Sequence, residues 1–366
     1  MSARALSVSV SVVALLVASA ALSAEPRQLV KDGLPKSGLS LSADGTRVAF
    51  LMDRADQIGD DVCVADVATG KMTNLTARLK EAPYTDNFFI PQLTPDGKTV
   101  VYVQGNELWS VAADGSAAPQ SLTDGEGVDW ILMAPRRGGV VFSSSRALSL
   151  ADLEKPAPKG VAGVVMTKLC LYDLAAKKVS MLTRDWVADG EKAQLMPDGR
   201  LVTVGGYPDK QDGYSNRFIT AIDDKGKRTK TSMGPVFSFE PAYLNGGSTL
   251  VVIDQVLKGD DFVYPLVTWD FATKKRGTLD ITLPKGQMVS WMWSVPDFKS
   301  IVMAVGKEGE GYDIYRFDPA SKTPVRLTEK KFASCYGGSI TPDGKKLLFV
   351  GSLPAVKGEE VWVLDL

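Results

Sequence analysis

Aromatic side chains recur in this sequence shortly before apolar runs of the kind that form β-strands, and a carboxylate often lies beside them. An aromatic ring with a polar tip is a common anchor for a peptide or protein partner. Such a ring can also serve only in packing, and we expect Trp130 and Trp293, inside or next to apolar runs, to be core residues. The candidate partner-binding residues are Tyr84, Asp86, Phe88, Asp129, Asp185, Trp186, Trp291 and Tyr336.

The sequence contains no histidine and no G-x-S-x-G motif. Without histidine there is no Ser-His-Asp or Cys-His nucleophile, no histidine-ligated zinc or manganese, and no imidazole acid or base. Without the glycine-flanked serine there is no hydrolase elbow. We therefore assign no catalytic residue and no cofactor, and an enzyme built from this sequence would rely on Asp, Glu, Lys, Arg and Tyr.

Four acidic, glycine-containing stretches could supply oxygen ligands, at residues 53–61, 209–213, 259–261 and 308–311. Calcium prefers oxygen ligands, and an exported protein would meet calcium. The spacing of these carboxylates matches no defined calcium loop. We interpret the four stretches as solvated hairpin tips, assign no metal ligand, and keep calcium binding as the alternative.

These residues must be positioned by a repeated β-structure. Four short strands are predicted at residues 90–94, 99–104, 107–112 and 119–123, because the turn formers 95–97 and 113–115 separate apolar runs. One such four-stranded meander cannot bury both of its faces alone. It therefore needs copies of itself as neighbours.

The copies are present, with turn signals at Asp44, 295–297 and Asp343 and degenerate ones at 135–138, 196–199 and 244–247. Six intervals cover the 299 residues from Asp44 to Asp343, and a repeat of about 50 residues is typical of propeller blades. The predicted fold is all-β, a seven-bladed β-propeller of four-stranded antiparallel blades. The last repeat lacks a fourth strand, and residues 27–30 resemble the fourth-strand ending 326–328, so we expect an N-terminal strand to close the ring.

The propeller geometry sorts the loops into two faces. The Asp-Gly turns share one face, whereas the loops from strand two to strand three and the connections between blades share the other. The Asp-Gly face is short and uniform, and the opposite face is long and varied, so we place the binding residues on the varied face, at the channel mouth. The long insertion at 146–165 either covers part of that mouth or folds onto a blade edge.

Cysteine spacing argues against disulfides. Cys63 and Cys170 occupy the same slot of the third strand in two separate repeats. Equivalent slots in non-adjacent blades are too far apart, since the Cα atoms of a disulfide lie within about 7 Å. We therefore expect Cys63 and Cys170 to be packed thiols and Cys335 to be unpaired.

The T-P-D-G turn, the apolar strand, the aromatic two residues before an apolar-Asp pair and the R-x-L-T ending resemble the WD40-like repeat of TolB-type propellers. The run 122–130 is also similar to the propeller of the S9 acylaminoacyl and dipeptidyl peptidases. The resemblance implies a propeller fold over nearly the whole mature chain. TolB-type function would imply protein partners in the cell envelope, but the separate N-terminal domain of that family has no counterpart in this sequence.

Residues 1–24 have the features of a secretory signal peptide, with one positive charge at Arg4, an apolar stretch and small residues up to Ala24. We expect residues 25–366 to form a single propeller domain, monomeric, periplasmic or secreted, with no membrane span once the signal is removed. The net charge of -1 gives no indication of a basic surface that would bind nucleic acid.

The function predicted from the sequence is that of an exported, non-catalytic module that binds a peptide or protein partner at its channel mouth. Two alternatives stay open. One is an enzyme of the same fold, such as a metal-assisted polysaccharide lyase or a hydrolase. The other is a detached S9-type propeller that docks a separate hydrolase.

Overall fold

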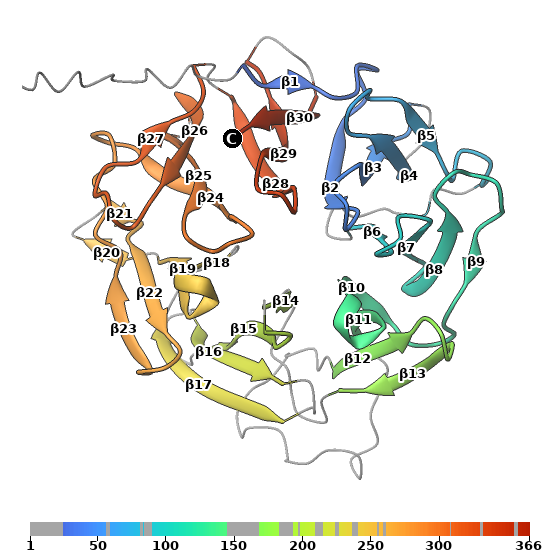
Figure 1. Ribbon diagram of the computed structural model, residues 1–366, viewed down its shortest axis with the longest axis horizontal. Helices are drawn as coiled ribbons and strands as arrows, with labels where there is room; N and C mark the ends of the chain where they lie inside the picture. The colour runs from blue at the N-terminus through green and yellow to red at the C-terminus, as the bar shows by residue number, and fades with distance from the viewer. Residues whose placement is uncertain are drawn as a thin grey trace, which may run out of the picture.

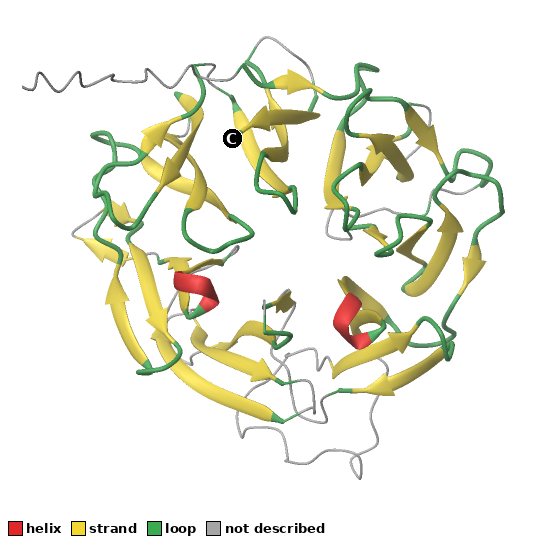
Figure 2. Ribbon diagram, viewed as in Figure 1, coloured by secondary structure: helices red, strands yellow, loops and turns green. Residues whose placement is uncertain are grey.

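The computed structural model describes residues 25–55, 59–80, 83, 90–144, 168–182, 193–196, 198–208, 215–223, 227–235, 241–254, 256–258, 261–307, 309–329, 332–354 and 358–366. In this part of the chain seven four-stranded antiparallel sheets stand in a ring, as Figure 1 shows. Two 3-10 turns, at Pro135–Arg137 and Asn245–Gly247, are the helical elements in Figure 2. The predicted seven-bladed β-propeller is therefore confirmed.

The blades follow one another along the chain, and each runs outward from its first strand. Blade one consists of β2 (Lys36–Leu41), β3 (Arg47–Asp53), β4 (Asp60–Asp66) and β5 (Met72–Asn74). Blade two consists of β6 (Gln92–Leu93), β7 (Thr99–Gln104), β8 (Glu107–Ala112) and β9 (Gln120–Ser121). Blade three consists of β10 (Val128–Ala134), β11 (Gly139–Ser144), β12 (Lys168–Asp173) and β13 (Lys178–Met181).

Blade four consists of β14 (Ala193–Leu195), β15 (Leu201–Pro208), β16 (Ser215–Ile222) and β17 (Arg228–Pro235). Blade five consists of β18 (Ala242–Leu244), β19 (Thr249–Ile253), β22 (Leu266–Asp270) and β23 (Lys275–Thr278). Blade six consists of β24 (Met288–Ser294), β25 (Ile301–Lys307), β26 (Gly311–Phe317) and β27 (Val325–Arg326). Blade five also carries a small hairpin of β20 (Val256–Lys258) and β21 (Asp261–Val263).

Blade seven is built from both ends of the described chain. Its strands are β28 (Ser334–Ile340), β29 (Lys346–Ser352), β30 (Glu360–Asp365) and, as the fourth, β1 (Arg27–Gln28). β1 pairs antiparallel with β30 in a register that sets Arg27 opposite Val363, and the Leu29 amide continues the ladder to the Val361 carbonyl at 2.8 Å. The predicted closure by an N-terminal strand is confirmed.

The Asp-Gly turns fold by the chemistry of their own side chains. In the second blade the Thr94 hydroxyl donates to Asp96 at 2.7 Å, and the same carboxylate accepts the Lys98 amide at 3.1 Å. Gly97 adopts a φ of 66°, which is costly for residues with a Cβ. The hydroxyl and amide donors hold the pKa of Asp96 below its usual value, and in the first blade the matching bonds lower the pKa of Asp44 to about 2.

The R-x-L-T ending locks the fourth strand onto the third. In blade six the Thr328 hydroxyl accepts the Ile314 amide at 2.9 Å and donates to Asp313 at 3.1 Å, while Arg326 pairs with the other carboxylate oxygen of Asp313 at 2.6 Å. Asp313 is 6% exposed, so its charge is desolvated and depends on these donors. The motif is therefore a structural lock in this blade.

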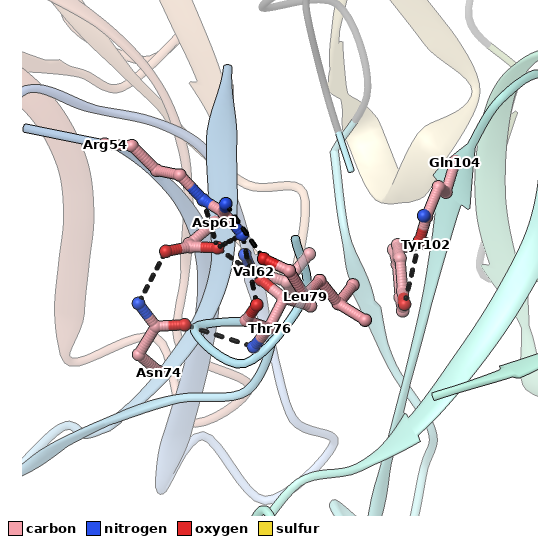
Figure 3. Close-up of polar contacts among 8 residues, drawn as sticks. All are labelled: Arg54, Asp61, Val62, Asn74, Thr76, Leu79, Tyr102 and Gln104. Carbon is pink, nitrogen blue, oxygen red and sulfur yellow. Dashed lines mark hydrogen bonds and ion pairs between the residues drawn. The ribbon is translucent and has the colours of Figure 1, made fainter. Parts of the chain in front are cut away.

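The same lock recurs in the first two blades. Thr76 bonds Asp61 at 2.8 Å in blade one, and Thr123 bonds Glu107 at 2.5 Å in blade two. In blade one the arginine comes from the loop after β3: Arg54 donates to Asp61 at 2.7 Å and to the Leu79 carbonyl at 3.1 Å, as Figure 3 shows.

Blade seven lacks the threonine of this lock, because Val30 occupies the position that corresponds to Thr328 of blade six. Glu360 occupies the carboxylate position there, and its partner is the buried Lys36 at the start of β2, at 2.7 Å. Lys36 also bonds Asp32 and the Leu34 carbonyl. The last blade is thus locked by a side chain of the first.

The core lies between neighbouring blades and contains the three cysteines as buried thiols. Cys63 and Cys170 stand opposite Phe50 and Phe142 in their sheets, so they share a slot as predicted, and the structure joins none of the three in a disulfide. Trp130 and Trp293, 6% and 5% exposed, are core residues, also as predicted. Within the described residues no helix is long and apolar enough to cross a membrane.

Candidate functional site

The structure brings two of the predicted binding residues together. Trp291 of β24 and Tyr336 of β28 are both half-buried, and their ring centroids lie 6.0 Å apart at an interplanar angle of 56°. Asp129 lies in β10, where the register shifts between Val128 and Trp130, but its side chain is not among those described. Five predicted residues lie outside the described part of the chain, namely Tyr84, Asp86, Phe88, Asp185 and Trp186.

Strand bulges position both rings. The pairing of β24 with β25 shifts between Val289 and Trp291, and the pairing of β28 with β29 shifts just after Tyr336. A bulge turns the neighbouring side chains away from the regular alternation of a strand. After Tyr336 the bulge needs glycine, because Gly337 has a φ of 60° and a Cβ on Gly338 would stand 1.9 Å from the Leu348 carbonyl oxygen.

A core tryptophan fixes this bulge from the neighbouring blade. The Trp293 indole donates to the Gly337 carbonyl at 2.5 Å. Trp293 and Trp291 lie two residues apart in β24, yet Trp293 is buried while Trp291 keeps an exposed part. In β24, Trp293 therefore stabilises the packing against blade seven, whereas Trp291 is partly accessible to solvent.

The Tyr336 hydroxyl donates to a carboxylate of blade seven, Glu359. Glu359 also accepts the Ser334 hydroxyl at 3.1 Å, and Ser334 in turn contacts Ser352 at 2.8 Å. Burial raises the pKa of Tyr336, and the hydrogen bond to Glu359 and the charges of Glu359 and Asp53 raise it further. The hydroxyl therefore stays protonated at physiological pH and acts as a donor.

Two carboxyl groups meet at the end of the adjacent hairpin in blade one. Asp53 closes β3 and stands opposite Asp60, the first residue of β4. Burial, then a hydrogen bond to Asp53, then the charges of Asp53 and Asp61 raise the pKa of Asp60 to about 7. Near neutral pH Asp60 is therefore protonated for part of the time and can then donate a hydrogen bond to Asp53.

The basic side chains described in this region already have partners. Lys36 is enclosed by Glu360, Asp32 and a carbonyl, and Arg54 by Asp61 and two carbonyls. Figure 1 shows β24, β28 and β2 side by side as the first strands of three consecutive blades. We name the group made of Trp291, Tyr336, Glu359, Asp53 and Asp60 the seam site.

Sequence reasoning missed the carboxyl members of the seam site. The sequence predicts a solvated hairpin tip at 53–61, but Asp60 and Asp61 are each only 5% exposed. The interpretation was wrong for these two residues because they belong to strand β4. Segments near both ends of the described chain also pack over the base of the hairpin, through the bonds from Asp53 to Pro35 and from Lys36 to Glu359. The sequence signal for their burial is that Asp60 and Asp61 directly precede the apolar run 62–65.

Among the side chains that the structure describes, no group of three or more carboxylates or thiols is placed to hold a metal ion. Of the acidic stretches considered for calcium, 209–213 lies outside the described residues, and so do 259–260 and 308.

Comparisons with known proteins agree on the fold. No family model matches the chain, and no curated protein matches it. Among solved structures, an oligogalacturonate lyase in complex with manganese is 16% identical with a TM-score of 0.66, over 95% of this chain and 94% of that one. The propeller domain of the trilobed protease of Pyrococcus furiosus, described as having an open velcro topology, is 12% identical with a TM-score of 0.58, over 90% and 95%.

A third similar structure, the acylaminoacyl peptidase of Pyrococcus horikoshii, is 11% identical with a TM-score of 0.60, over 90% of this chain and 51% of that one. At such identities the likeness concerns the fold alone. The class that the fold defines is the seven-bladed β-propeller, which here has a closed ring. The similar structures include both enzymes and a propeller domain, so the fold does not determine the function.

Proposed function

We propose that this protein is an exported, monomeric β-propeller that binds a peptide or protein partner at the channel mouth without catalysing a reaction, as TolB-type propellers bind envelope partners. The observation that carries the proposal is the contact between Trp291 and Tyr336. Two aromatic rings from adjacent blades, held by bulges and still partly exposed, form the kind of rigid anchor surface that dominates binding energy at interfaces.

The position of these rings supports the proposal. They lie on the first strands of blades six and seven, Trp291 at the middle of β24 and Tyr336 in the first half of β28, and the Asp-Gly-type turns follow the far ends of these strands. Loops that differ from blade to blade can shape a specific surface, whereas repeated turns cannot. The proposal keeps the remaining candidates from the sequence, Tyr84, Asp86, Phe88, Asp129, Asp185 and Trp186, as further partner-binding residues.

The test is a pull-down from the cell-envelope fraction with the full mature protein. Trp291→Ala should reduce capture of the main bound protein at least 30-fold, which corresponds to about 2 kcal/mol. The matched control is Phe298→Ala, which removes a half-buried aromatic ring from an Asp-Gly-type turn on the opposite face. The proposal fails if both variants capture the partner equally well, or if Trp291→Ala unfolds in a thermal melt.

A second candidate function is supported by Asp60. A carboxyl group with a pKa near 7 is suited to general acid or base catalysis at neutral pH, and Tyr336 lies close to its partner Asp53. An enzyme of this kind would be a lyase or hydrolase acting on a polysaccharide or peptide. The test of this candidate is to incubate wild type and Asp60→Asn with polygalacturonate and with peptide substrates. Turnover by wild type that disappears in the variant would favour an enzyme.

A further inference from the structure

The surface to be explained is the exposed part of the Trp291 and Tyr336 rings. These rings do not face a neutral environment, because Glu359 accepts the Tyr336 hydroxyl and the charge of Asp53 acts on the same hydroxyl. An apolar ligand on the rings would desolvate these carboxylates without compensation, and an anionic ligand would be repelled. A cation would be attracted by the rings and by the carboxylates.

The protein does not supply that cation itself from its described residues. Lys36 and Arg54, basic residues of the same blade as Asp53 and Asp60, are each held by a buried carboxylate and by carbonyl oxygens. Among the described residues, the titratable and charged groups of the site and of the segments that contact it are Asp32, Lys36, Asp53, Arg54, Asp60, Asp61, Tyr336, Glu359 and Glu360. With both basic groups matched by Glu360 and Asp61, the excess charge at the rings is negative.

We infer that the seam site receives a basic side chain of the partner, an arginine in preference to a lysine. This inference rests on the proposed function and names the chemistry of its ligand. A guanidinium can lie flat against an indole or phenol ring and at the same time donate two parallel hydrogen bonds to one carboxylate, whereas an ammonium makes only a point contact.

The carboxyl pair makes this recognition depend on pH. A bound cation favours the ionised form of Asp60, so binding below about pH 7 must release the proton that Asp60 holds against Asp53. Affinity should therefore fall as the pH falls below 7, by at most about tenfold per pH unit for one linked proton. Above pH 7 Asp60 is already ionised, and the affinity should level off.

The test selects peptides from a phage library of random nonapeptides on the immobilised full-length mature protein, in parallel with Trp291→Ala. Peptides retained by wild type and lost by the variant should share an arginine or lysine at one position. If such Trp291-dependent peptides exist but lack a basic residue, the inference is wrong while the proposed function stands. If no peptide depends on Trp291, the proposed function fails as well.

One selected peptide is then measured by fluorescence anisotropy. Replacing its arginine by glutamine should weaken binding about tenfold or more, and Glu359→Gln, which keeps the shape of the side chain, should do the same with little added effect on the glutamine peptide. Asp60→Asn should abolish the loss of affinity between pH 7 and pH 6, and Phe298→Ala should change neither measurement. An unchanged affinity in Glu359→Gln, or a pH profile identical in Asp60→Asn, would overturn the inference.

Discussion

The closure of the ring by β1 yields a prediction that can be worked out from the structure. Leu29 is 6% exposed and packs with Val67, Val361 and Val363 in the core between blades seven and one. Replacing a buried leucine by alanine removes its transfer free energy and leaves a cavity, and such changes cost about 2–5 kcal/mol. We expect Leu29→Ala to lower the free energy of unfolding by about 3 kcal/mol.

A matched control lies in the equivalent strand of blade six. Val325 belongs to β27, which completes its blade as β1 completes blade seven, but Val325 is 55% exposed. Val325→Ala should therefore change stability by no more than about 0.5 kcal/mol. Deleting residues 25–31 should cost more than Leu29→Ala, because it also leaves the edge of β30 unpaired.

The assay is equilibrium unfolding in urea, followed by tryptophan fluorescence and analysed with a common slope for the point variants. The reasoning is refuted if Leu29→Ala and Val325→Ala have the same midpoint, or if the protein lacking residues 25–31 unfolds together with wild type. Either result would mean that β1 adds no stability to blade seven.

Two further predictions concern single polar side chains. The pKa of Asp60 is raised from 3.8 to about 7 in the folded state, so the folded state binds the extra proton and stability falls as the pH rises from about 4 to 7. Asp60→Asn should remove this fall and gain on wild type by about 2.5 kcal/mol between pH 5 and pH 8 in urea melts, since about two pH units of the fall lie in that range and each is worth about 1.4 kcal/mol. Thr328→Val leaves the Ile314 amide and one Asp313 oxygen without their hydroxyl partner, so it should lower the free energy of unfolding by about 3 kcal/mol. Thr328→Ser keeps the hydroxyl and should lower it by less than about 1 kcal/mol. Equal losses of stability in the two variants would show that the hydroxyl does not stabilise the blade.

Much of the fold could be predicted because its signals are local. The Thr94 and Asp96 side chains make their turn bonds within five residues of sequence, so the motif carries its own structural cause. Ring closure could be predicted for a related reason: a strand in excess at one end matched a strand missing at the other. The slot shared by Cys63 and Cys170 followed from the same repeat.

The candidate site was only partly predictable, because its contacts depend on the departures from the repeat. The contact of Trp291 with Tyr336 arises from two bulges, and a bulge shows itself only when both strands of a pair are placed. Gly337 and Gly338 were a visible signal for one of them. The carboxyl pair of Asp53 and Asp60 was hidden for another reason: an acidic hairpin looks solvated until the chain ends that cover it are known.

The pairing of β1 with β30 also fixes when the ring can be completed during synthesis. Among the described strands β1 leaves the ribosome first and β30 last, so six blades can form from neighbouring segments, while β1 must wait until β28, β29 and β30 of the seventh blade have been made. In that interval β1 is an unpaired strand, free to add to the edge of another sheet. If two nascent chains meet, the β1 of one can complete the seventh blade of the other, and a domain-swapped dimer results from the same contacts that close the monomer.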